Sequence, residues 1–424
     1  MKKFIIFIIL MFSHSIFAEK LDLATCYKKA TEASPLYKQK MMYESINMLE
    51  NQNLTSNYYP QFNIDGQATY QSDVFKLPLN LPPTLPFTLD IPTIPQGQYR
   101  VNLNINETIW DGGLTSYSKD KANYDNLSNK QSVEVNLFKI KDIINQLFFT
   151  DFILTKNIHV LQSLKTTLDS NFKQMESLIS NGVALKSSRD GIQIEIFKTN
   201  QKIEELKRDK IAARNMLGKW IGSDVTLETE LTIPEINNYQ VSKYNRPEYE
   251  LFDLKSKQTE TGENLLSAQL MPKFAAFFQA GYGAPNQLNF FKTKGSWYYL
   301  AGLKMLWTPF DWSTSQKKRE ELELSRQIID SEKGNFDLSL HISTIKDESD
   351  IKKFDETIRQ DDAIINLQLE VVREKLSKLT NGTITSTEYI TELNNLTQYQ
   401  INKELHIIQQ LNAKVNLLTK TGNL

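Results

Sequence analysis

The sequence predicts an internally duplicated, largely helical chain in which long antiparallel helical hairpins are combined with four amphipathic β-strands. Three observations lead to this fold class. Motifs recur at an offset of about 200 residues, four runs of about ten residues alternate between apolar and polar side chains, and two stretches of more than 60 residues contain no proline. Each copy follows one order: helix, strand, loop, strand, very long helix, tight turn and long helix.

The duplication is visible in matched motifs whose offset changes once along the chain. Pro35 aligns with Pro247, an offset of 247 − 35 = 212, whereas Gly182 aligns with Gly382, an offset of 382 − 182 = 200. The first copy therefore contains 212 − 200 = 12 additional residues, which lie between Pro60 and Trp110, an interval that holds a proline-rich loop between two strands. A repeat of this length is too long for a solenoid unit and indicates a duplicated half-protein.

The N-terminus has the three parts of a secretory signal peptide, namely basic residues, a short apolar run and a small residue near position 18. We therefore expect residues 1–18 to be removed on export. The first repeat is expected at 19–221 and the second at 246–424. Between them, 222–245 contains little periodicity and is expected to pack around the helical body as a connecting segment at its equator.

Four alternating runs predict the strands, at about 61–72, 98–109, 273–283 and 297–308. The first two form a hairpin around a loop at 73–97, and the last two form a second hairpin with a shorter loop. The side chains expected on the apolar face include Phe62, Ile64, Tyr99, Leu103, Ala276 and Leu303, with Asn104 on the polar face. One face of each hairpin should therefore meet an apolar medium and the other should meet water.

Each run has the length that a tilted strand needs to cross a bilayer, and aromatic residues gather at the run ends. No run of about 18 apolar residues follows the signal, so we expect an exported membrane protein of this sequence to span as a β-barrel. Four strands cannot close around a lumen, which requires about eight. Two, three or four copies would have to share a barrel, and two hairpins of a soluble sandwich remain the alternative.

Two helical hairpins are expected at about 115–220 and 313–420. Their tips, near 181–188 and 381–388, both begin with Asn-Gly, which can adopt the left-handed conformation that ends a helix. Hydroxyl residues then offer N-caps for the returning helices, Ser187 or Ser188 at the first tip and Ser386 or Thr387 at the second. Glu388 follows in the first helical turn, where the helix dipole favours an anion. The apolar stripes on these helices predict core packing and no cofactor site.

Composition excludes several other classes of protein. The formal net charge is −1, and −1 − 2 = −3 without the two signal-peptide lysines, which argues against a nucleic-acid partner. Cys26 is the only cysteine, so it is expected to be a small buried thiol without a disulfide. The histidines are scattered at spacings unlike those of zinc ligands, and no hydrolase, metalloprotease or phosphate-loop motif occurs. We expect no catalytic residues, no metal and no cofactor.

With these elements in place, the mature chain resembles the TolC family of outer-membrane efflux ducts. The residues that carry the resemblance are Leu23-Ala24, Ser34-Pro35, Tyr59-Pro60-Gln61-Phe62, the run Glu107 to Gly113, Arg246-Pro247-Glu248, Pro272 with Phe274, the run Trp307 to Asp311, and the tip Asn381 to Glu388. The resemblance implies a homotrimer whose twelve strands form one barrel in the outer membrane of a Gram-negative cell. It also implies a twelve-helix α-barrel in the periplasm, a periplasmic adaptor protein and an inner-membrane transporter.

The resemblance also assigns candidate functional residues at the tips. Glu388 matches the position of the family's acidic periplasmic gate, where three copies around an axis would attract cations; the alternative is a solvated side chain that caps its own helix. Thr391 stands where some members have a second acid, so a double ring of acids is not expected. The expected adaptor-contact residues are Gly182, Ser188, Arg189, Asp190, Gly382, Thr383 and Thr387. Ser188 departs from the acid that the family pattern would place there.

The leading functional hypothesis is a passive exit duct of a tripartite efflux or type I secretion system, which contacts outer-membrane lipid, the adaptor and the transporter. The sequence does not choose among drugs, metals or proteins as the substrate. A different class of protein, an exported trimeric coiled-coil stalk or adhesin without transport activity, is the alternative. An envelope enzyme is a third hypothesis, and it would require a pocket lined by convergent polar groups.

Overall fold

The computed structural model describes residues 20–75, 93–241 and 243–424. The expected signal peptide and most of the loop expected at 73–97 lie outside the described residues. The chain forms two compact units, and each contains segments of both sequence repeats. The first unit comprises Met1–Lys40, Gln131–Glu250 and Lys333–Leu424, and the second comprises Met41–Lys130 and Leu251–Glu332.

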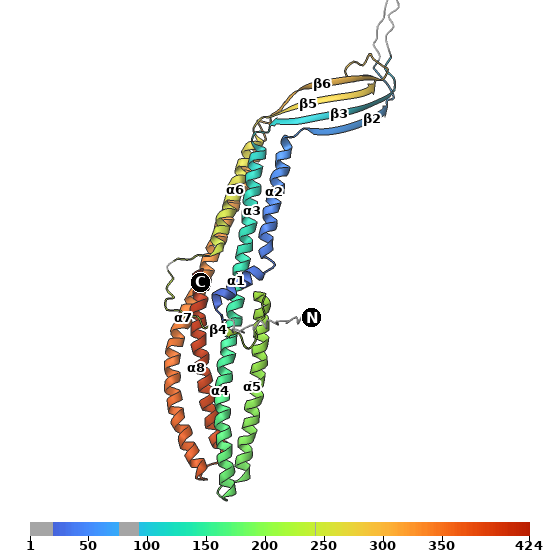
Figure 1. Ribbon diagram of the computed structural model, residues 1–424. Coiled ribbons are helices and arrows are strands. Elements are labelled where there is room, and N and C mark those ends of the chain that lie inside the picture. The colour runs from blue at the N-terminus through green and yellow to red at the C-terminus, as the bar shows by residue number, and fades with distance from the viewer. Residues whose placement is uncertain (1–19, 76–92, 242) are drawn as a thin grey trace, which may run out of the picture. The chain divides into compact units, whose positions relative to one another are not determined.

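The elements follow the order expected from the sequence in both repeats (Figure 1). The helices are α1 (Leu23–Ala33), α2 (Tyr37–Thr55), η1 (Ser56–Tyr58), α3 (Leu114–Phe138), α4 (Ile140–Ser180), α5 (Lys186–Ile221), α6 (Pro247–Gln269), α7 (Thr314–Thr380) and α8 (Ser386–Thr421). The strands are β1 (Lys20–Leu21), β2 (Gln61–Tyr70), β3 (Gly97–Trp110), β4 (Glu230–Leu231), β5 (Lys273–Ala284) and β6 (Ser296–Leu306). The ends of β2, β3, β5 and β6 lie within two residues of the strand ranges expected from alternation.

In the second unit, these four strands form one antiparallel sheet in the order β2-β3-β5-β6 (Figure 1). The central pair joins β3 of the first repeat to β5 of the second. One row of the register runs through Phe62, Ile105, Phe278 and Ala301, one residue from each strand. Because side chains alternate between faces, this register places Phe62, Ile105, Phe278 and Ala301, together with the apolar residues two positions away on each strand, on one face.

That apolar face is exposed in the isolated chain. Its most accessible large side chains are Phe62, Ile64, Tyr70, Trp297, Tyr299 and Leu303, each between 69% and 79% exposed. Such an extent of exposed apolar surface marks an interface with lipid or with another protein. In the described sheet, β2 and β6 each have only one neighbouring strand, so the sheet also has two open edges.

Hydrogen-bonded polar side chains cross the other face of the sheet. Asp65 on β2 accepts hydrogen bonds from the side-chain amides of Asn102, at 3.0 Å, and Asn104 on β3. Gln279 on β5 donates to the Asn104 side chain at 2.7 Å, and Tyr298 on β6 donates to Asn102. The polar face is therefore connected from one edge strand to the other, which agrees with the expected assignment of Asn104.

Long helices account for most of the remaining chain, and α7 runs without interruption for 67 residues. The sequence predicts one equally continuous helix from 116 to 179, but the structure divides it into α3 and α4 at Lys139. There the backbone amide of Asp142 donates to the Lys139 carbonyl, a tightening to three-residue spacing that does not require proline or glycine. Within the described ranges, no helix combines the length and hydropathy needed to cross a bilayer.

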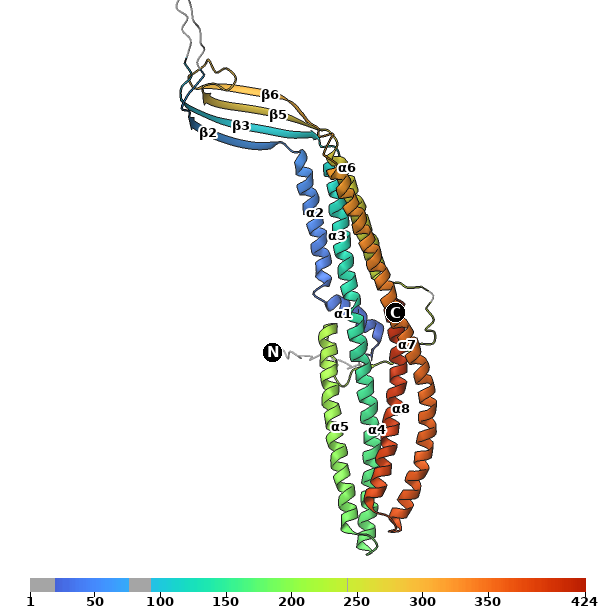
Figure 2. The same cartoon turned by 180° about the vertical axis from the view of Figure 1, so that it is seen from behind.

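In the first unit, α5, α4, α8 and α7 lie side by side in that order, as both views show (Figures 1 and 2). The connecting segment is attached to this unit by β4, which pairs in parallel with β1. A buried ion pair adds to the attachment, because Arg214 on α5 binds Asp151 on α4 at 2.6 Å and also donates to the Thr229 carbonyl at 3.0 Å. The segment therefore packs against the helices, as its position between the repeats predicts.

Cys26 lies on α1 and is fully buried, so the expectation of a small buried thiol is confirmed. Removal from water raises the pKa of this thiol from 9.0 to about 12. On the next residue, the Tyr27 hydroxyl donates to the Asn145 side chain of α4 and lies 3.3 Å from the Thr419 hydroxyl of α8. These contacts join α1 to one helix from each hairpin.

Candidate functional site

The two hairpin tips have the same backbone geometry at the end of the first helix. Gly182 and Gly382 have φ values of 75° and 71°, in the left-handed region. The amide of Val183 donates to the Leu178 carbonyl, and that of Thr383 donates to the Lys378 carbonyl, both at 2.9 Å. With the shorter-range bonds from the two glycine amides, these form a Schellman motif at each tip. Left-handed glycines at both tips agree with the Asn-Gly signal.

The N-caps of the returning helices differ from those expected. At the first tip the cap residue is Leu185, with no side-chain hydrogen bond, so Ser187 and Ser188 were the wrong choice. At the second tip the cap is Thr385, one residue before Ser386. The reason is geometric, because the Schellman turn returns the chain to helix after only a few residues and the next helix begins before those serines are reached.

Glu388 lies in the first turn of α8 and completes a capping box. The Thr385 hydroxyl accepts from the Glu388 amide at 3.3 Å, while one Glu388 carboxylate oxygen, Oε1, accepts from the Thr385 amide at 3.4 Å. The other oxygen, Oε2, lies 4.0 Å from the ammonium of Lys375 on α7. The side chain remains half exposed. Glu388 therefore stabilises its own helix, and it retains enough exposure to meet a solute or a second copy.

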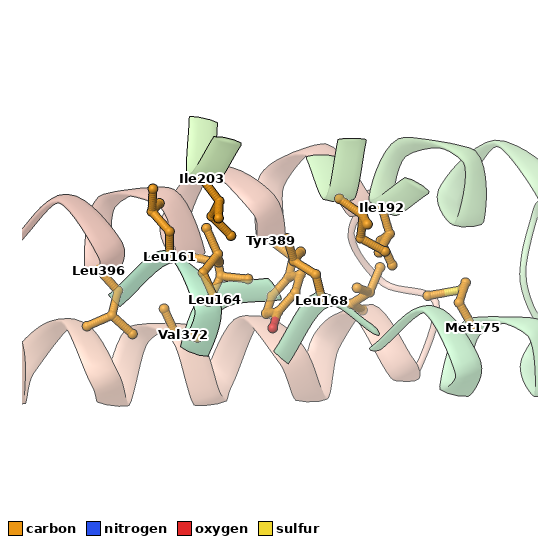
Figure 3. Close-up of a cluster of buried hydrophobic side chains, with 12 residues drawn as sticks. Leu161, Leu164, Leu168, Met175, Ile192, Ile203, Val372, Tyr389 and Leu396 are labelled. Atoms are coloured by element: carbon orange, nitrogen blue, oxygen red, sulfur yellow. The ribbon is translucent and has the colours of Figure 1, made fainter. Parts of the chain in front are cut away.

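A hydrophobic cluster behind the tips joins the two hairpins (Figure 3). Its buried members come from α4, α5, α7 and α8, and they are Leu161, Leu164, Leu168, Met175, Ile192, Ile196, Ile203, Val372, Leu379, Tyr389, Leu393 and Leu396. Leu164 and Leu168 belong to the stripe that the sequence assigns to core packing. Because the cluster draws on every helix of both hairpins, their relative position depends on its packing.

Tyr389 brings a polar group into the middle of this cluster. It is fully buried, and its hydroxyl accepts a hydrogen bond from the Asn171 side chain of α4 at 2.6 Å. Burial raises the pKa of this hydroxyl above its usual value of 10.0. Sequence reasoning did not select either residue. The spacing of Tyr389, Leu393 and Leu396 could have identified Tyr389 as the first member of the α8 stripe.

Two further contacts hold α8 against α5 near the tips. The side-chain amide of Asn394 donates to Glu195 at 2.9 Å. Gly191 approaches α8 so closely that a Cβ there would lie 3.0 Å from the Ser386 hydroxyl oxygen. The second hairpin is thus fixed to the first by a buried hydrogen bond, a partly buried one and a close helix approach.

The exposed residues of the two tips differ in chemistry. At the first tip, Val183 and Leu185 are exposed, at 55% and 73%. Two residues of the expected adaptor-contact set follow, with Arg189 donating to its neighbour Asp190 at 2.7 Å, while Ser188 is partly exposed. At the second tip, Thr383 and Thr387 are exposed. The first tip is therefore apolar at its end and the second is polar, a difference that Val183 and Leu185 show in the sequence.

Apolar side chains are also exposed on the two flanking helices. Phe197 on α5 and Leu367 on α7 are 64% and 71% exposed. Phe197 follows the first-tip glycine by 197 − 182 = 15 residues, and Leu367 precedes the second-tip glycine by 382 − 367 = 15. Ile194 and Val371 extend the two patches at similar heights. Within the described residues, the flanks of the four-helix array thus have matching apolar surfaces that no other segment covers.

In the described part of the chain, no group of three or more histidine, cysteine, aspartate or glutamate side chains is arranged to hold a metal ion. His406 on α8 lies 2.6 Å from the Asp361 carboxylate of α7 and is stacked on Phe354. That geometry joins two helices of one hairpin and accounts for the histidine without a metal.

Solved structures of bacterial outer-membrane channels match the chain over almost its full length. CusC, in a study of its folding and transmembrane channel formation, gives a TM-score of 0.69 at 11% identity, covering 94% of this chain and 91% of that one. The outer membrane protein VceC from Vibrio cholerae gives 0.67 at 11%, covering 94% and 96%. The CmeC outer membrane channel of Campylobacter jejuni gives 0.64 at 11%, covering 95% and 85%. No family model and no curated protein matches the sequence.

Proposed function

Because the chain has the fold of the TolC-like outer-membrane channels, which confirms the fold class expected from its sequence, we propose that it is the exit duct of a tripartite efflux or type I secretion system. Solutes would pass through it passively, from an inner-membrane transporter and a periplasmic adaptor to the outside of the cell. The single observation that carries the proposal is the four-stranded sheet, which has one apolar face, one polar face and two open edges.

The sheet supports a barrel shared among copies. An edge strand with unpaired backbone groups is a site for pairing with another chain. The strands are long enough for their apolar face to cross the hydrocarbon layer of a bilayer. Joining β6 of one copy to β2 of the next would satisfy both edges. Three copies would give twelve strands, with the apolar side chains toward lipid and the Asp65-Asn102-Asn104 network toward water.

The helical flanks support a ring of copies in the periplasm. Phe197 on α5 and Leu367 on α7 lie at equal distances along the chain from their tips, so α5 of one copy can pack on α7 of the next. Association would remove these side chains from water, at roughly 25 cal/mol for each Å² of apolar surface buried. Three copies would place twelve helices of the α4, α5, α7 and α8 type around one axis.

In this arrangement the tips form the periplasmic mouth. We assign Glu388 to the gate, because three copies of a half-exposed carboxylate near one axis would attract cations. The adaptor would contact the ends of the hairpins. The residues assigned to that contact are Gly182, Ser188, Arg189, Asp190, Gly382, Thr383 and Thr387. Opening would require the two hairpins to separate near the cluster around Tyr389.

Conductance and cross-linking test the proposal together. A variant with Phe197→Cys and Leu367→Cys should give disulfide-linked trimers on oxidation, since Cys26 is buried and does not compete. The matched control pairs Phe197→Cys with Ile342→Cys, because Ile342 is exposed but lies 382 − 342 = 40 residues from its tip. The purified trimer should conduct ions in planar bilayers, more readily with Glu388→Gln. Trimers that never conduct, even with the tip residues mutated, would instead favour the coiled-coil stalk or adhesin.

A further inference from the structure

The polar face of the β-sheet has an excess of basic side chains. Among the described strand residues, the register places Arg100, Lys273 and Lys304 on this face together with a single acid, Asp65. The net charge of the face is 3 − 1 = +2 in one chain. Glu107 points to the opposite, apolar face, because it pairs with Ala276 in the register. The excess is therefore confined to the face that carries the hydrogen-bonded polar network.

These basic groups are not neutralised within the sheet. Among the described residues, no carboxylate lies within ion-pair distance of Arg100, Lys273 or Lys304, whereas Asp65 is occupied by hydrogen bonds from Asn102 and Asn104. We propose that this face selects anionic solutes as they leave the duct, with Arg100 as the main contact. The inference rests on the proposed channel, in which three copies would bring 3 × 2 = +6 charges to one lumen.

The turn between β5 and β6 brings solutes close to Arg100. The Tyr298 hydroxyl on the polar face lies 2.6 Å from the side-chain oxygen of Gln287, so the turn folds over this face. Between the turn and the strands lies a cavity of about 280 Å³, lined by Arg100, Gln67, Gln98 and Phe290 among others. A solute in this cavity meets the Arg100 guanidinium, side-chain amides and the Phe290 ring.

The turn that makes this cavity is internally ordered by Asn286. Its side-chain oxygen accepts from the amides of Leu288 and Asn289, both at 3.0 Å, and its side-chain nitrogen donates to the Ser296 hydroxyl at 2.8 Å. Asn286 is buried. The turn is therefore held by its own hydrogen bonds, and it contributes Phe290 to the cavity that Arg100 also lines.

The chemistry of the cavity favours an anion with carboxylate or phosphate oxygens. A guanidinium presents several N–H donors in a planar fork that matches such oxygens, and it keeps its charge at any physiological pH. Rings of basic side chains in a pore raise the local concentration of anions and exclude cations. Lys273 and Lys304 continue the positive surface toward the helical end of the sheet.

Reversal potentials across planar bilayers test the inference. The purified trimer would be placed between dilute KCl solutions of unequal concentration, because salt screens charges over about 10 Å at 0.1 M. Arg100→Gln should lower the chloride-to-potassium permeability ratio about threefold. Asp65→Asn should raise the ratio, because Asp65 is the one acid that the register of the described strands places on this face. Glu107→Gln is the matched control, and it should leave the ratio unchanged because its side chain is on the lipid side.

A competition measurement complements the potentials. Benzoate added on the side of the β5–β6 turn should reduce the conductance of wild type about threefold more than that of Arg100→Gln. A conducting trimer whose ratio does not respond to Arg100→Gln, or responds equally to Glu107→Gln, would overturn this inference and leave the proposed duct intact. A wild-type trimer that does not conduct at all would overturn both.

Discussion

The buried hydrogen bond between Tyr389 and Asn171 should hold the two hairpins together. Tyr389→Phe removes the hydroxyl and leaves the Asn171 amide without its acceptor inside the cluster. An unsatisfied buried polar group costs about 1–3 kcal/mol. Asn171→Leu should cost a similar amount, because it leaves the Tyr389 hydroxyl without its donor. Replacing both residues removes donor and acceptor together and should be close to neutral.

With a near-neutral double variant, the double-mutant cycle therefore predicts a coupling free energy whose magnitude is the sum of the two single losses, about 2–6 kcal/mol. Because α4 and α8 belong to different hairpins, each single variant should also populate separated tips more often. A destabilisation of 1.4 kcal/mol corresponds to about a tenfold shift in the equilibrium. The stability of the trimer would be measured by thermal unfolding, and the open fraction by single-channel recording.

Tyr399→Phe is the matched control on the same helix. Its hydroxyl makes no hydrogen bond within the described residues, and the side chain is only partly buried, so this variant should change neither stability nor open fraction. If the free energy of unfolding lost in the double variant equalled the sum of the two single losses, the reasoning would be refuted. So would a Tyr389→Phe channel with the stability and open fraction of wild type.

Four other changes test separate parts of the molecule. Glu388→Gln should alter ion selectivity without lowering the melting temperature, because glutamine preserves the capping box, whereas Glu388→Ala should also lose about 0.5–1 kcal/mol; equal melting of both would count against the cap. Gly382→Val should impair coupling to the adaptor more than membrane insertion, because a branched residue at φ 71° is strained by about 1–3 kcal/mol, and wild-type transport would contradict this. Ala276→Arg should impair barrel assembly, because a charged side chain that faces lipid costs about 2–4 kcal/mol. If Arg were tolerated equally well at positions 276 and 104, the assignment of the two faces would be refuted. Cys26 should resist thiol reagents at pH 8 until the protein unfolds; since its folded pKa is raised from 9.0 to about 12, the stability it contributes should be present below pH 9 and lost as the pH rises toward 12.

The strands and their faces could be predicted from the sequence because they depend on local alternation. Residues such as Ile64 and Leu303 can be assigned to the apolar face because they alternate with residues of the other face. The register then follows from aligning the apolar faces of neighbouring strands. The tip glycines could be predicted for a similar reason, since Asn-Gly followed by a new helical period has few backbone solutions. Information within a few residues was enough in these cases.

Features that depend on contacts between distant segments could not be predicted. Nothing near Asn171 in the sequence indicates that its amide meets Tyr389, which lies 218 residues later. Leu185 as the cap could not be predicted from residue type, because leucine has no side-chain acceptor and the tight turn before it starts the helix ahead of the serines. The break in the helix at Lys139 could not be predicted because neither proline nor glycine marks it in the sequence. The roles of Glu388 and of the tip residues in gating and docking stay predictions.

The pairing of β3 with β5 joins two strands that are synthesised at different times. β3 ends at Trp110 and β5 begins at Lys273, so 273 − 110 = 163 positions separate the two partners. At about 5–20 residues per second, a ribosome needs roughly 8–30 s to supply the second partner. During that time the hairpin of β2 and β3 has an unpaired strand edge and an exposed apolar face. This combination makes a chain prone to aggregation. A chaperone that shields one nascent ribbon until the other arrives would therefore set the yield of correctly assembled protein.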